Sequence, residues 1–486
     1  MDVLWQRQAS LQTILKTLPA DSWVVTDGVF VRERLICSLP HSDLTHLQSL
    51  SRNLSGDEWQ RFKKYTARVI TLAVPWNAIL ILPSYVWISV ETVQLLGMES
   101  QRGGFWPKLR RLKCDVGWEI APFMSLFLTP TITDLDLTLP LEINRLLQPT
   151  LSLLTHTCHR LRSLKLRVDT SGPLSSDEIA RLISTSKTTL HRIEIVSPTP
   201  PQIFSAIINL QQLQYLHLEN PRFPNNIPPK ILSRLETIYF NGSRGSSTNQ
   251  FLRQLSLQRL AMVSISGGET IRLPPLLDSL HGAATTMKNL DLSPATALNN
   301  SAITLLRSFI DLISLTIHCD CEVRGPGQPC SLQLTDEVIS ELGAALPRIS
   351  SLRVGSYCRT PHLVTFTSLV HLSRTCGFLD SLSIRVDFTS VVNRSDSLTN
   401  PGPGANSAHP PRSKSRLRSF AAGASTIPDT PGCEWVVALA LVSVFPSAQL
   451  LLPFRINEAS DRWKEVGRGI SVCKNVFHIA QEAGKH

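Results

Sequence analysis

The segment Leu161-Arg162-Ser163-Leu164-Lys165-Leu166 decides the fold of this chain, because its spacing of apolar residues returns along most of the sequence. The pattern is apolar-x-x-apolar-x-apolar, and it stands again in Leu213-Gln214-Tyr215-Leu216-His217-Leu218. Side chains two positions apart lie on the same face of a β-strand. Leu164 and Leu166 are therefore predicted to face a core, while Lys165 between them faces the opposite side.

The pattern forms a repeat of nearly constant length. From Leu109 to Leu312, consecutive copies begin 22 to 29 residues apart. Units of about 20–29 residues, each with one short strand, are typical of leucine-rich repeats. The eleven clear copies begin at Leu109, Ile132, Leu161, Leu190, Leu213, Leu235, Leu260, Met287, Leu312, Ile349 and Leu379. Val69-x-x-Leu72-x-Val74 also fits, and Leu417-x-x-Phe420-x-Ala422 is a weak match.

Helical segments are predicted between these strands. Ser175–Ser186 opens with Ser175 and Glu178 at the spacing of a capping box. The segment after Thr199-Pro200, Asn300–Ile310 and Thr335–Ala345 repeat the helical spacing of apolar residues. One strand and one helix per unit predict an α/β fold, a leucine-rich-repeat solenoid or horseshoe with a parallel sheet on the concave face and helices outside.

This solenoid is expected to be irregular. The Asn or Cys that often follows the strand, and forms a buried hydrogen-bonded ladder, is missing from the repeats. The interval between Leu312 and Ile349 lengthens to 37 residues, and the stretch Cys321–Pro329, which contains Gly325-Pro326-Gly327, is predicted to be an exposed loop.

Four parts of the chain are expected. Residues 1–68 form a helical N-terminal segment, with helices at Trp5–Leu18 and Asp57–Tyr65, and residues 69–399 form the solenoid. Residues 400–416 are rich in Pro, Gly, Ser and basic residues, and are predicted to be a disordered linker. Residues 417–486 are a last repeat and a cap, with elements at Trp435–Phe445, Ala448–Leu452 and Ala459–Gly467.

Composition places the chain among proteins of the cytoplasm or nucleus. Of its 486 residues 42% are hydrophobic, and its 10 Cys follow no even framework of disulfide pairs, which favours reduced thiols such as Cys114 at core positions. No basic start with an apolar run opens the sequence, so no secretory signal is predicted. Proline interrupts the most apolar windows, Val69–Leu96 and Trp435–Leu452, so we expect no membrane partner.

The residues that alternate with the core positions are the candidate partner-binding site. They are expected to line the concave face, where they meet a protein substrate. These side chains are Asp134, Asp136, Lys165, Arg167, Arg192, Glu194, Tyr215, His217, Asn289, Asp291, Thr316 and His318. Tyr215 with His217 is the best local candidate, because an exposed Tyr offers rigid amphipathic contact area. Arg167 and Arg192 are placed to meet an acidic segment.

Catalysis and cofactors are not expected. The sequence has no phosphate-binding Gly loop followed by Lys-Ser/Thr, no nucleophile elbow and no His-Glu-x-x-His motif. Cys158-His159 with His156, and His318-Cys319-x-Cys321 with Cys330, resemble metal ligands only in part. A structural zinc site usually shows two such pairs, and neither group has a second one. We therefore expect repeat-packing or loop thiols and no metal.

The two ends of the chain carry short motifs of one family. Leu4-Trp5 followed by Leu15-x-x-Leu18-Pro19-x-Asp21-x-Trp23, then Asp57-x-Trp59-x-x-Phe62-x-x-Tyr65, resembles the segment after the F-box in mushroom-type (basidiomycete) fungal F-box/leucine-rich-repeat proteins. Phe445-Pro446 and Arg462-Trp463-Lys464-Glu465-Val466 resemble their closing segment. In that family an F-box precedes the Leu-Trp pair and binds the Skp adaptor of a cullin ubiquitin ligase, whereas this sequence begins at Leu-Trp.

Three functions remain open at this point. The first is a protein-interaction scaffold that serves as the substrate-recognition part of an F-box ubiquitin ligase, with the Skp adaptor as partner only if an upstream F-box exists. The second is a leucine-rich-repeat binding protein outside any ligase. The third, ranked last, is nucleic-acid association through the basic cluster Arg412, Lys414, Arg416 and Arg418, within a net charge of +10.

Overall fold

The computed structural model describes most of the chain from residue 54 to residue 483, and residues 9–10, 14, 18–19, 23–28 and 45–50 before it. Within 54–483 the description leaves out residues 75–85, 89, 101–103, 116–120, 140–143, 169–175, 225–226, 230, 296–297, 320–329, 331, 357, 359–362, 392–415, 423–424, 429 and 452–458. The loop predicted at Cys321–Pro329 and nearly all of the linker predicted at 400–416 lie outside the described residues.

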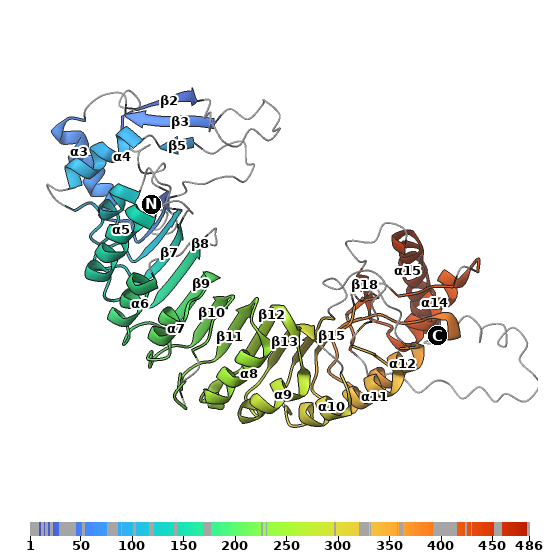
Figure 1. Cartoon of the computed structure of the whole chain (residues 1–486). Helices are drawn as coiled ribbons and strands as arrows, with labels where there is room; N and C mark the ends of the chain where they lie inside the picture. The colour runs from blue at the N-terminus through green and yellow to red at the C-terminus, as the bar shows by residue number, and fades with distance from the viewer. Residues whose placement is uncertain are drawn as a thin grey trace, which may run out of the picture. The chain divides into compact units, whose positions relative to one another are not determined.

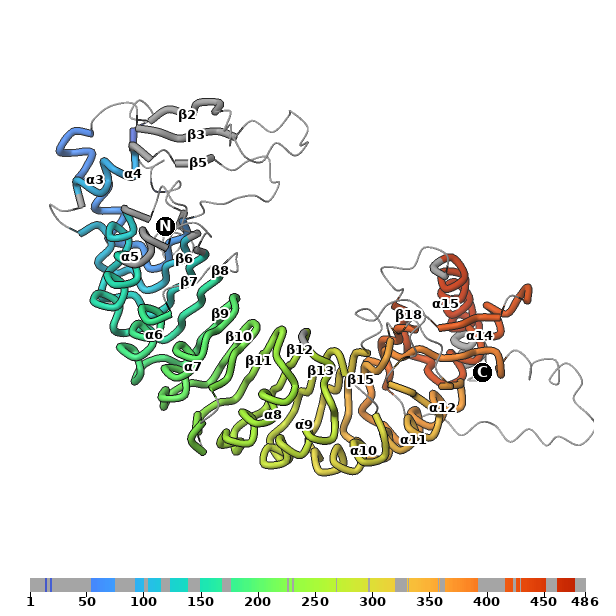
Figure 2. Tube along the Cα trace, viewed as in Figure 1, coloured from blue at the N-terminus to red at the C-terminus, as the bar shows by residue number. Residues whose placement is uncertain are grey.

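The chain divides into two compact units, Met1–Asn226 and Ile227–His486, and both are built from the same repeat of strand and helix. This division falls inside the span predicted as one solenoid, 69–399. In each unit the helices line one face of a parallel sheet and leave the other face open (Figure 1). In most repeats the trace runs from a strand through a helix to the next strand (Figure 2). The predicted fold, an α/β leucine-rich-repeat solenoid, is confirmed.

The strands of each parallel sheet lie in the order of the sequence. The first unit has β1 (Ala9–Ser10), β4 (Thr71–Val74), β6 (Arg111–Asp115), β7 (Asp134–Leu139), β8 (Ser163–Val168), β9 (Arg192–Pro198) and β10 (Tyr215–Glu219). The second has β11 (Thr237–Asn241), β12 (Met262–Ile271), β13 (Asn289–Ala295), β14 (Ser314–Ile317), β15 (Ser351–Val354), β16 (Ser381–Ile384), β17 (Ser419–Ala421) and β18 (Gln449–Leu451). The weak copy at Leu417 thus contributes a genuine strand, β17.

The helices connect these strands. In the first unit they are α3 (Gly56–Thr66), α4 (Val90–Ser100), α5 (Asn144–Thr157), α6 (Ser176–Thr185) and α7 (Pro201–Ile207), with a 3₁₀ helix at Ala121–Leu126. In the second they are α8 (Gly245–Gln254), α9 (Leu273–Ser279), α10 (Asn300–Leu306), α11 (Asp336–Ala345), α12 (Phe366–Thr375), α14 (Cys433–Val444) and α15 (Ala459–Ala483). No described helix combines the length and the apolar character needed to cross a membrane.

Apolar columns run through each sheet because the repeats are in register. Leu135 of β7 pairs with Leu164, which pairs with Ile193, and this in turn with Leu216 of β10. All four are buried. Burying one such side chain contributes about 1.5–3 kcal/mol, so the repeated apolar positions are the main source of stability.

Threonine hydroxyl groups connect neighbouring repeats at three places. Thr131, Thr189 and Thr286 each stand one position before a repeat window. Their Oγ1 atoms donate to the carbonyl of the first window residue in the preceding repeat, at 2.7 Å to Leu109, 2.7 Å to Leu161 and 2.9 Å to Leu260. These bonds join successive repeats at the turn that leads into each strand.

The N-terminal segment differs from the prediction. The helix expected at Asp57–Tyr65 is present as α3, and Ser55 caps it in a capping box with Glu58. The helix expected at Trp5–Leu18 is contradicted at Ala9–Ser10, which form β1 because the edge of β4 offers backbone hydrogen-bond partners. Residues 1–68 are also not wholly helical, since β2 (Trp23–Gly28) and β3 (Thr45–Leu50) form a small sheet with β5 (Val86–Ile88). The β-branched run Val24-Val25-Thr26 favours an extended chain there.

The C-terminal helices cap the last repeats of the second unit. Arg462 of α15 donates to Glu434 of α14 at 2.6 Å and to the Ile427 carbonyl at 2.9 Å. Trp463 is buried and donates to the Ser425 carbonyl at 3.2 Å.

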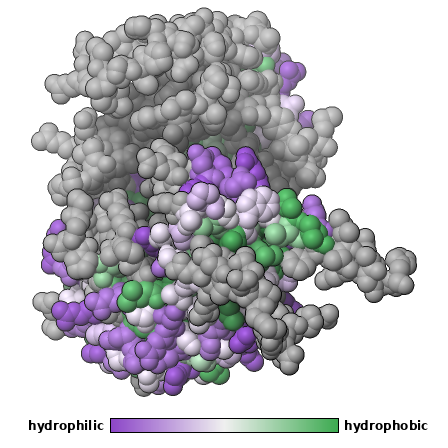
Figure 3. Space-filling model, turned by 90° about the vertical axis from the view of Figure 1, so that its right-hand side faces the viewer, coloured by the Kyte–Doolittle hydropathy of each residue, from purple (hydrophilic) through white to green (hydrophobic). Residues whose placement is uncertain are grey.

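Seen from the right-hand side of Figure 1, separate hydrophobic patches lie among hydrophilic ones on the surface (Figure 3). The exposed apolar side chains of the cap helices include Trp435, Leu439, Val472 and Val476.

Candidate protein-binding site

A row of alternating charge crosses the open face of the first unit. Parallel pairing of β6 to β10 places five side chains in register, namely Lys113, Asp136, Lys165, Glu194 and His217. We call these five residues the charged row. Two periodicities of the sequence create the charged row. The alternation along each strand turns these side chains away from the core, and the repeat of strand and helix brings successive copies side by side.

Glu194 is the centre of the charged row. Its carboxylate forms an ion pair with Lys165 of β8, and its other oxygen lies 3.5 Å from a guanidinium nitrogen of Arg192. Nδ1 of His217 is 3.8 Å away. Burial opposes ionisation of this carboxyl, but the hydrogen bond and charge of Lys165 and the charges of His217 and Arg192 outweigh it, so the pKa of Glu194 lies below its ordinary value.

At Asp136 and His217, unlike at Glu194, the effect of burial on the pKa outweighs that of the opposite charges nearby. It raises the pKa of Asp136 even though Arg167, Lys165 and Lys113 favour the charged form. It also lowers the pKa of His217, although Glu194 favours the imidazolium. The acidic side chains of the charged row are therefore partly or fully buried, and cationic side chains of the neighbouring strands lie beside them.

A second row lies beside the charged row. It consists of Arg111, Asp134, Ser163, Arg192 and Tyr215, matched in register across the same five strands. The guanidinium carbon of Arg192 is 3.7 Å from the ring centroid of Tyr215, which is a cation–π contact. Arg111 and Asp134 form a longer ion pair of 3.8 Å.

Most of the exposed charge on this face is basic. Asp134, whose side chain is 39% exposed, is the exception, and it pairs with Arg111. The side chains of Arg111 and Arg192 are 68% and 48% exposed, whereas that of Glu194 is 9% exposed. Lys113 is exposed and Asp136 is half-buried. The outermost groups of this face are therefore mostly basic, and one of them, Arg192, lies over the Tyr215 ring.

The structure divides the predicted site residues between the two units. Eight of them belong to β7–β10. Among these, Arg167 lies two residues beyond Lys165 and is opposite Val196 in register. The other four lie on or directly after β13 and β14, where Asp291 accepts a hydrogen bond of 3.2 Å from Ser264. Their neighbours in register on β15, β16 and β17 are mostly uncharged, and Arg353, opposite Thr316, is the exception. The concentration of charge is thus a property of the first unit.

Lys113 and Arg111 were not among the predicted residues. Lys113 occupies the same repeat position as Lys165, between Leu112 and Cys114 of the window that begins at Leu109. Because the window was visible in the sequence, aligning its middle positions would have identified this side chain.

Cys158 packs between repeats, as expected. Its buried thiol donates to the Thr129 carbonyl of the preceding repeat at 3.8 Å. Burial raises the pKa of Cys158 to about 12, so the thiol keeps its proton. His159, its neighbour in the sequence, is exposed. The group around Cys158 therefore has the features of a core position.

Comparison with known proteins gives distant structural similarities. No family model and no curated protein matches the chain. One similar solved chain comes from the structure of the Rad7 and Elc1 complex in yeast, with 17% sequence identity, a TM-score of 0.37, and coverage of 64% of this chain and 76% of that chain. Another is the leucine-rich repeat-containing protein LegL7 from Legionella pneumophila, with 13% identity, a TM-score of 0.30, and coverage of 63% and 89%. The assignment of the fold rests on the strand register and helix placement described above.

Proposed function

We propose that this chain is a protein-interaction scaffold, and that the open face of β6–β10 binds an acidic segment of its partner. The observation that carries the proposal is the separation of charge on that face. Glu194 is covered and paired with Lys165, and Asp136 is half-buried. Asp134 is more exposed but pairs with Arg111, while Arg111, Lys113 and Arg192 are exposed.

The geometry suits an extended or helical segment. Five strands spaced about 4.8 Å apart give a surface about 19 Å wide, open along its length. Tyr215 and Arg192 are the residue types most enriched among the side chains that dominate binding energy. The basic groups would increase the association rate of an acidic partner and make binding weaker at high salt.

We further propose that the partner is a substrate and that the chain is the substrate-recognition part of an F-box ubiquitin ligase. The motifs of the chain ends that resemble fungal F-box/leucine-rich-repeat proteins support this. Two of those motifs have structural roles. Phe62 of α3 packs edge-on against Phe105 at 5.2 Å before the repeat at Leu109, and Trp463 is buried in the C-terminal cap. A Skp adaptor would bind through an F-box joined upstream.

A charge-reversal pair tests the scaffold function. Lys113→Glu with Arg167→Glu changes the open face, and Arg160→Glu with Lys187→Glu makes the same change of charge at exposed turns that follow α5 and α6. Partners are isolated with the wild-type chain, purified, and measured directly against each variant. We expect the open-face pair to weaken binding at least about tenfold and the control pair to retain it. Equal binding by both pairs would contradict the proposed face.

A separate experiment tests the proposed ligase function. The gene upstream of Met1 is sequenced, and the chain with any upstream exon is isolated from cells and probed for the Skp adaptor and cullin. Recovery of both supports the ligase. A protein partner that binds the open face without either one would leave the scaffold standing and assign the chain to a binding function outside a ligase.

The basic cluster gives less support to nucleic-acid binding. Arg418 is engaged with Asp380 at 3.3 Å. Arg412 and Lys414 lie outside the described residues. Strongly salt-dependent binding of RNA or DNA by the purified chain would favour this third function over the scaffold.

A further inference from the structure

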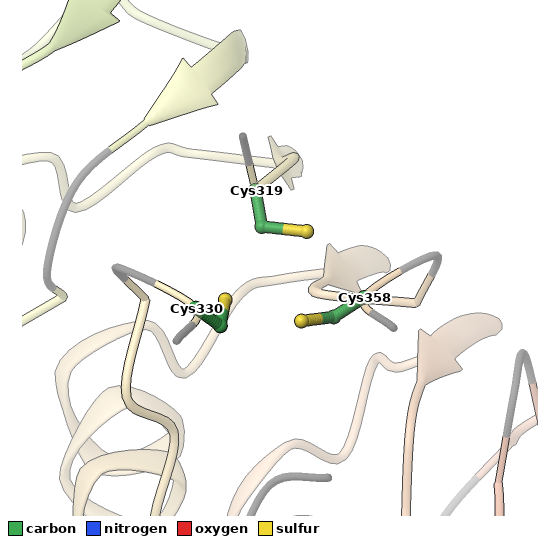
Figure 4. A group of neighbouring side chains, drawn as sticks. All are labelled: Cys319, Cys330 and Cys358. Atoms are coloured by element: carbon green, nitrogen blue, oxygen red, sulfur yellow. The ribbon is translucent and has the colours of Figure 1, made fainter. Parts of the chain in front are cut away.

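Three cysteines that are far apart in the sequence meet in the second unit. Cys319, Cys330 and Cys358 place their Sγ atoms within 4.8 Å of one another. They come from three different segments, and their sulfur atoms point toward a common space (Figure 4). Cys330 and Cys358 are buried, and Cys319 is partly exposed.

The fold explains why these segments meet. Cys319 follows β14 by two residues and Cys358 follows β15 by four, and these strands are parallel neighbours with Ile317 opposite Val354. The carboxyl ends of parallel strands lie at one edge of the sheet, so both thiols reach the same edge. Gly355, at φ +58°, donates to the Ile317 carbonyl at 3.1 Å and turns the chain after β15. Cys358 then donates from its backbone to the Gly355 carbonyl at 3.1 Å.

One hydrogen bond at this cluster has the opposite direction to those of two packing thiols. The thiols of Cys158 and Cys376 donate to backbone carbonyls of the preceding repeat, at 3.8 Å and 3.6 Å, as protonated groups do. Sγ of Cys330 instead accepts from the backbone N–H of Leu332 at 3.4 Å. An N–H donor stabilises a thiolate, which is the form that binds metals.

We propose that Cys319, Cys330 and Cys358 together bind one zinc ion. Sulfur ligands about 2.3 Å from a tetrahedral zinc lie about 3.8 Å from one another, so the three thiols are close to the required separation. Soft thiolate ligands select zinc among the common divalent ions. Three cysteines leave one coordination position to another donor. Cys321 lies outside the described residues and forms no part of the proposal.

The charge of a neighbouring side chain fits the same site. Three thiolates around Zn²⁺ carry a net charge of −1, and the guanidinium of Arg385, after β16, donates to the Cys358 carbonyl at 2.7 Å.

The site stands in one of the long repeats of the chain. The windows that begin at Leu312 and Ile349 are 37 residues apart, against 22 to 29 for the regular ones. A zinc ion would tie the ends of β14 and β15 to the segment before α11 and so close this long connection. Closing a long loop with a metal stabilises the folded state relative to the unfolded chain. This proposal departs from the expectation, based on sequence alone, that the cysteines bind no metal.

The test measures zinc on the full-length chain. The wild type, Cys330→Ser, Cys358→Ser and the control Cys473→Ser are purified under reducing conditions, supplied with ZnCl₂, freed of excess metal and analysed by mass spectrometry of the elements. We expect about one zinc per chain in the wild type and in Cys473→Ser, and loss to background in the other two variants. Equal zinc in the wild type and Cys330→Ser would overturn the proposal.

A second measurement on the wild type guards against variants that fail to fold. Removing zinc with a chelator should lower the melting temperature, and ZnCl₂ but not MgCl₂ should restore it. Co²⁺ added to the zinc-free chain should produce the absorption band of thiolate-to-cobalt charge transfer. An unchanged melting temperature together with no such band, or a disulfide between Cys330 and Cys358 in the reduced preparation, would overturn the site.

Discussion

The guanidinium of Arg192 lies over the ring of Tyr215, with its central carbon 3.7 Å from the ring centroid. The two residues are direct neighbours in register on β9 and β10. The same guanidinium is 3.5 Å from Glu194, so one side chain connects the aromatic ring to the charged row. This arrangement fixes the orientation of Tyr215 before any partner arrives.

The cation–π contact should be measurable in a double-mutant cycle. We expect Arg192→Met and Tyr215→Leu to show a coupling of about 0.5–1 kcal/mol in the free energy of unfolding, as partly exposed cation–π pairs do. Urea unfolding of the four proteins in the cycle gives this value. Strictly additive effects would mean that the contact contributes nothing to stability.

Glu194→Gln should destabilise the first unit. Lys165 would lose its ionic partner while remaining mostly covered, since its side chain is 22% exposed. The expected cost is about 1–3 kcal/mol in the free energy of unfolding. The control is Asp278→Asn, which removes the exposed pair with Arg253 and should change stability by at most about 0.5 kcal/mol. Replacing both partners, as Lys165→Met with Glu194→Leu, should recover part of the loss.

His217 should make stability depend on pH. Burial holds its pKa in the folded state below the ordinary value of 6.5, while Glu194 and Glu219 oppose this and Lys165 and Arg192 add to it. As pH falls through 6.5 the unfolded chain takes up the proton first, so stability decreases until the folded-state pKa is reached. Urea unfolding between about pH 7.5 and about pH 5.5 measures this loss. His217→Gln should remove part of the slope, and an identical slope in the variant would contradict the prediction.

Gly469→Ala should destabilise the C-terminal cap. A Cβ atom at Gly469 would stand 2.8 Å from Cβ of Ala438 in α14, a separation that packed carbon atoms do not tolerate. We expect a loss of about 1–3 kcal/mol, seen in thermal or urea unfolding. Gly467→Ala is the matched control, because its new Cβ meets Leu450 at an ordinary 3.7 Å and the helix gains up to about 1 kcal/mol. Adding Ala438→Gly to Gly469→Ala should restore stability if the clash is the cause.

Thr189→Val should reveal how much a threonine hydrogen bond between repeats contributes to the free energy of unfolding. Val keeps the shape of Thr but cannot donate to the Leu161 carbonyl, now 2.7 Å from Oγ1. The expected cost is about 0.5–1.5 kcal/mol. Thr185→Val is the control, since its hydroxyl bonds only to Arg181 within the exposed face of α6. Equal effects of the two substitutions would mean that the bond between repeats has no special weight.

Repetition made the fold readable from sequence. Each window places apolar residues at fixed positions. Because every repeat packs against similar repeats, few features of the fold depend on contacts with distant parts of the chain. The predicted helices at Ser175–Ser186 and Thr335–Ala345 accordingly appear as α6 and α11. Outside the repeats the outcome was mixed. The helices expected at Asp57–Tyr65 and Trp435–Phe445 appear as α3 and α14. The helix expected over Ala9–Ser10 does not, because pairing with β4 overrides the local helical preference.

The candidate site was predictable in part. The alternation of the strand identified Lys165, Glu194 and His217 as residues of the open face. It did not identify their ion pairs, because the register between strands fixes which side chain meets which. Burial, which separates covered carboxylates from exposed guanidiniums, is likewise a property of the assembled sheet.

The sequence alone determined the repeat, the strand-and-helix unit and the side chains that turn away from the core, since these follow from periodicity along one chain. Only the tertiary structure decided that Thr189 bonds to the preceding repeat and that Glu194 gathers Lys165, Arg192 and His217. It also decided that Cys358 joins Cys319 and Cys330. The physical reason is that each of these contacts joins residues from different repeats, and their distance in space is set by strand register and loop path, not by spacing in the sequence.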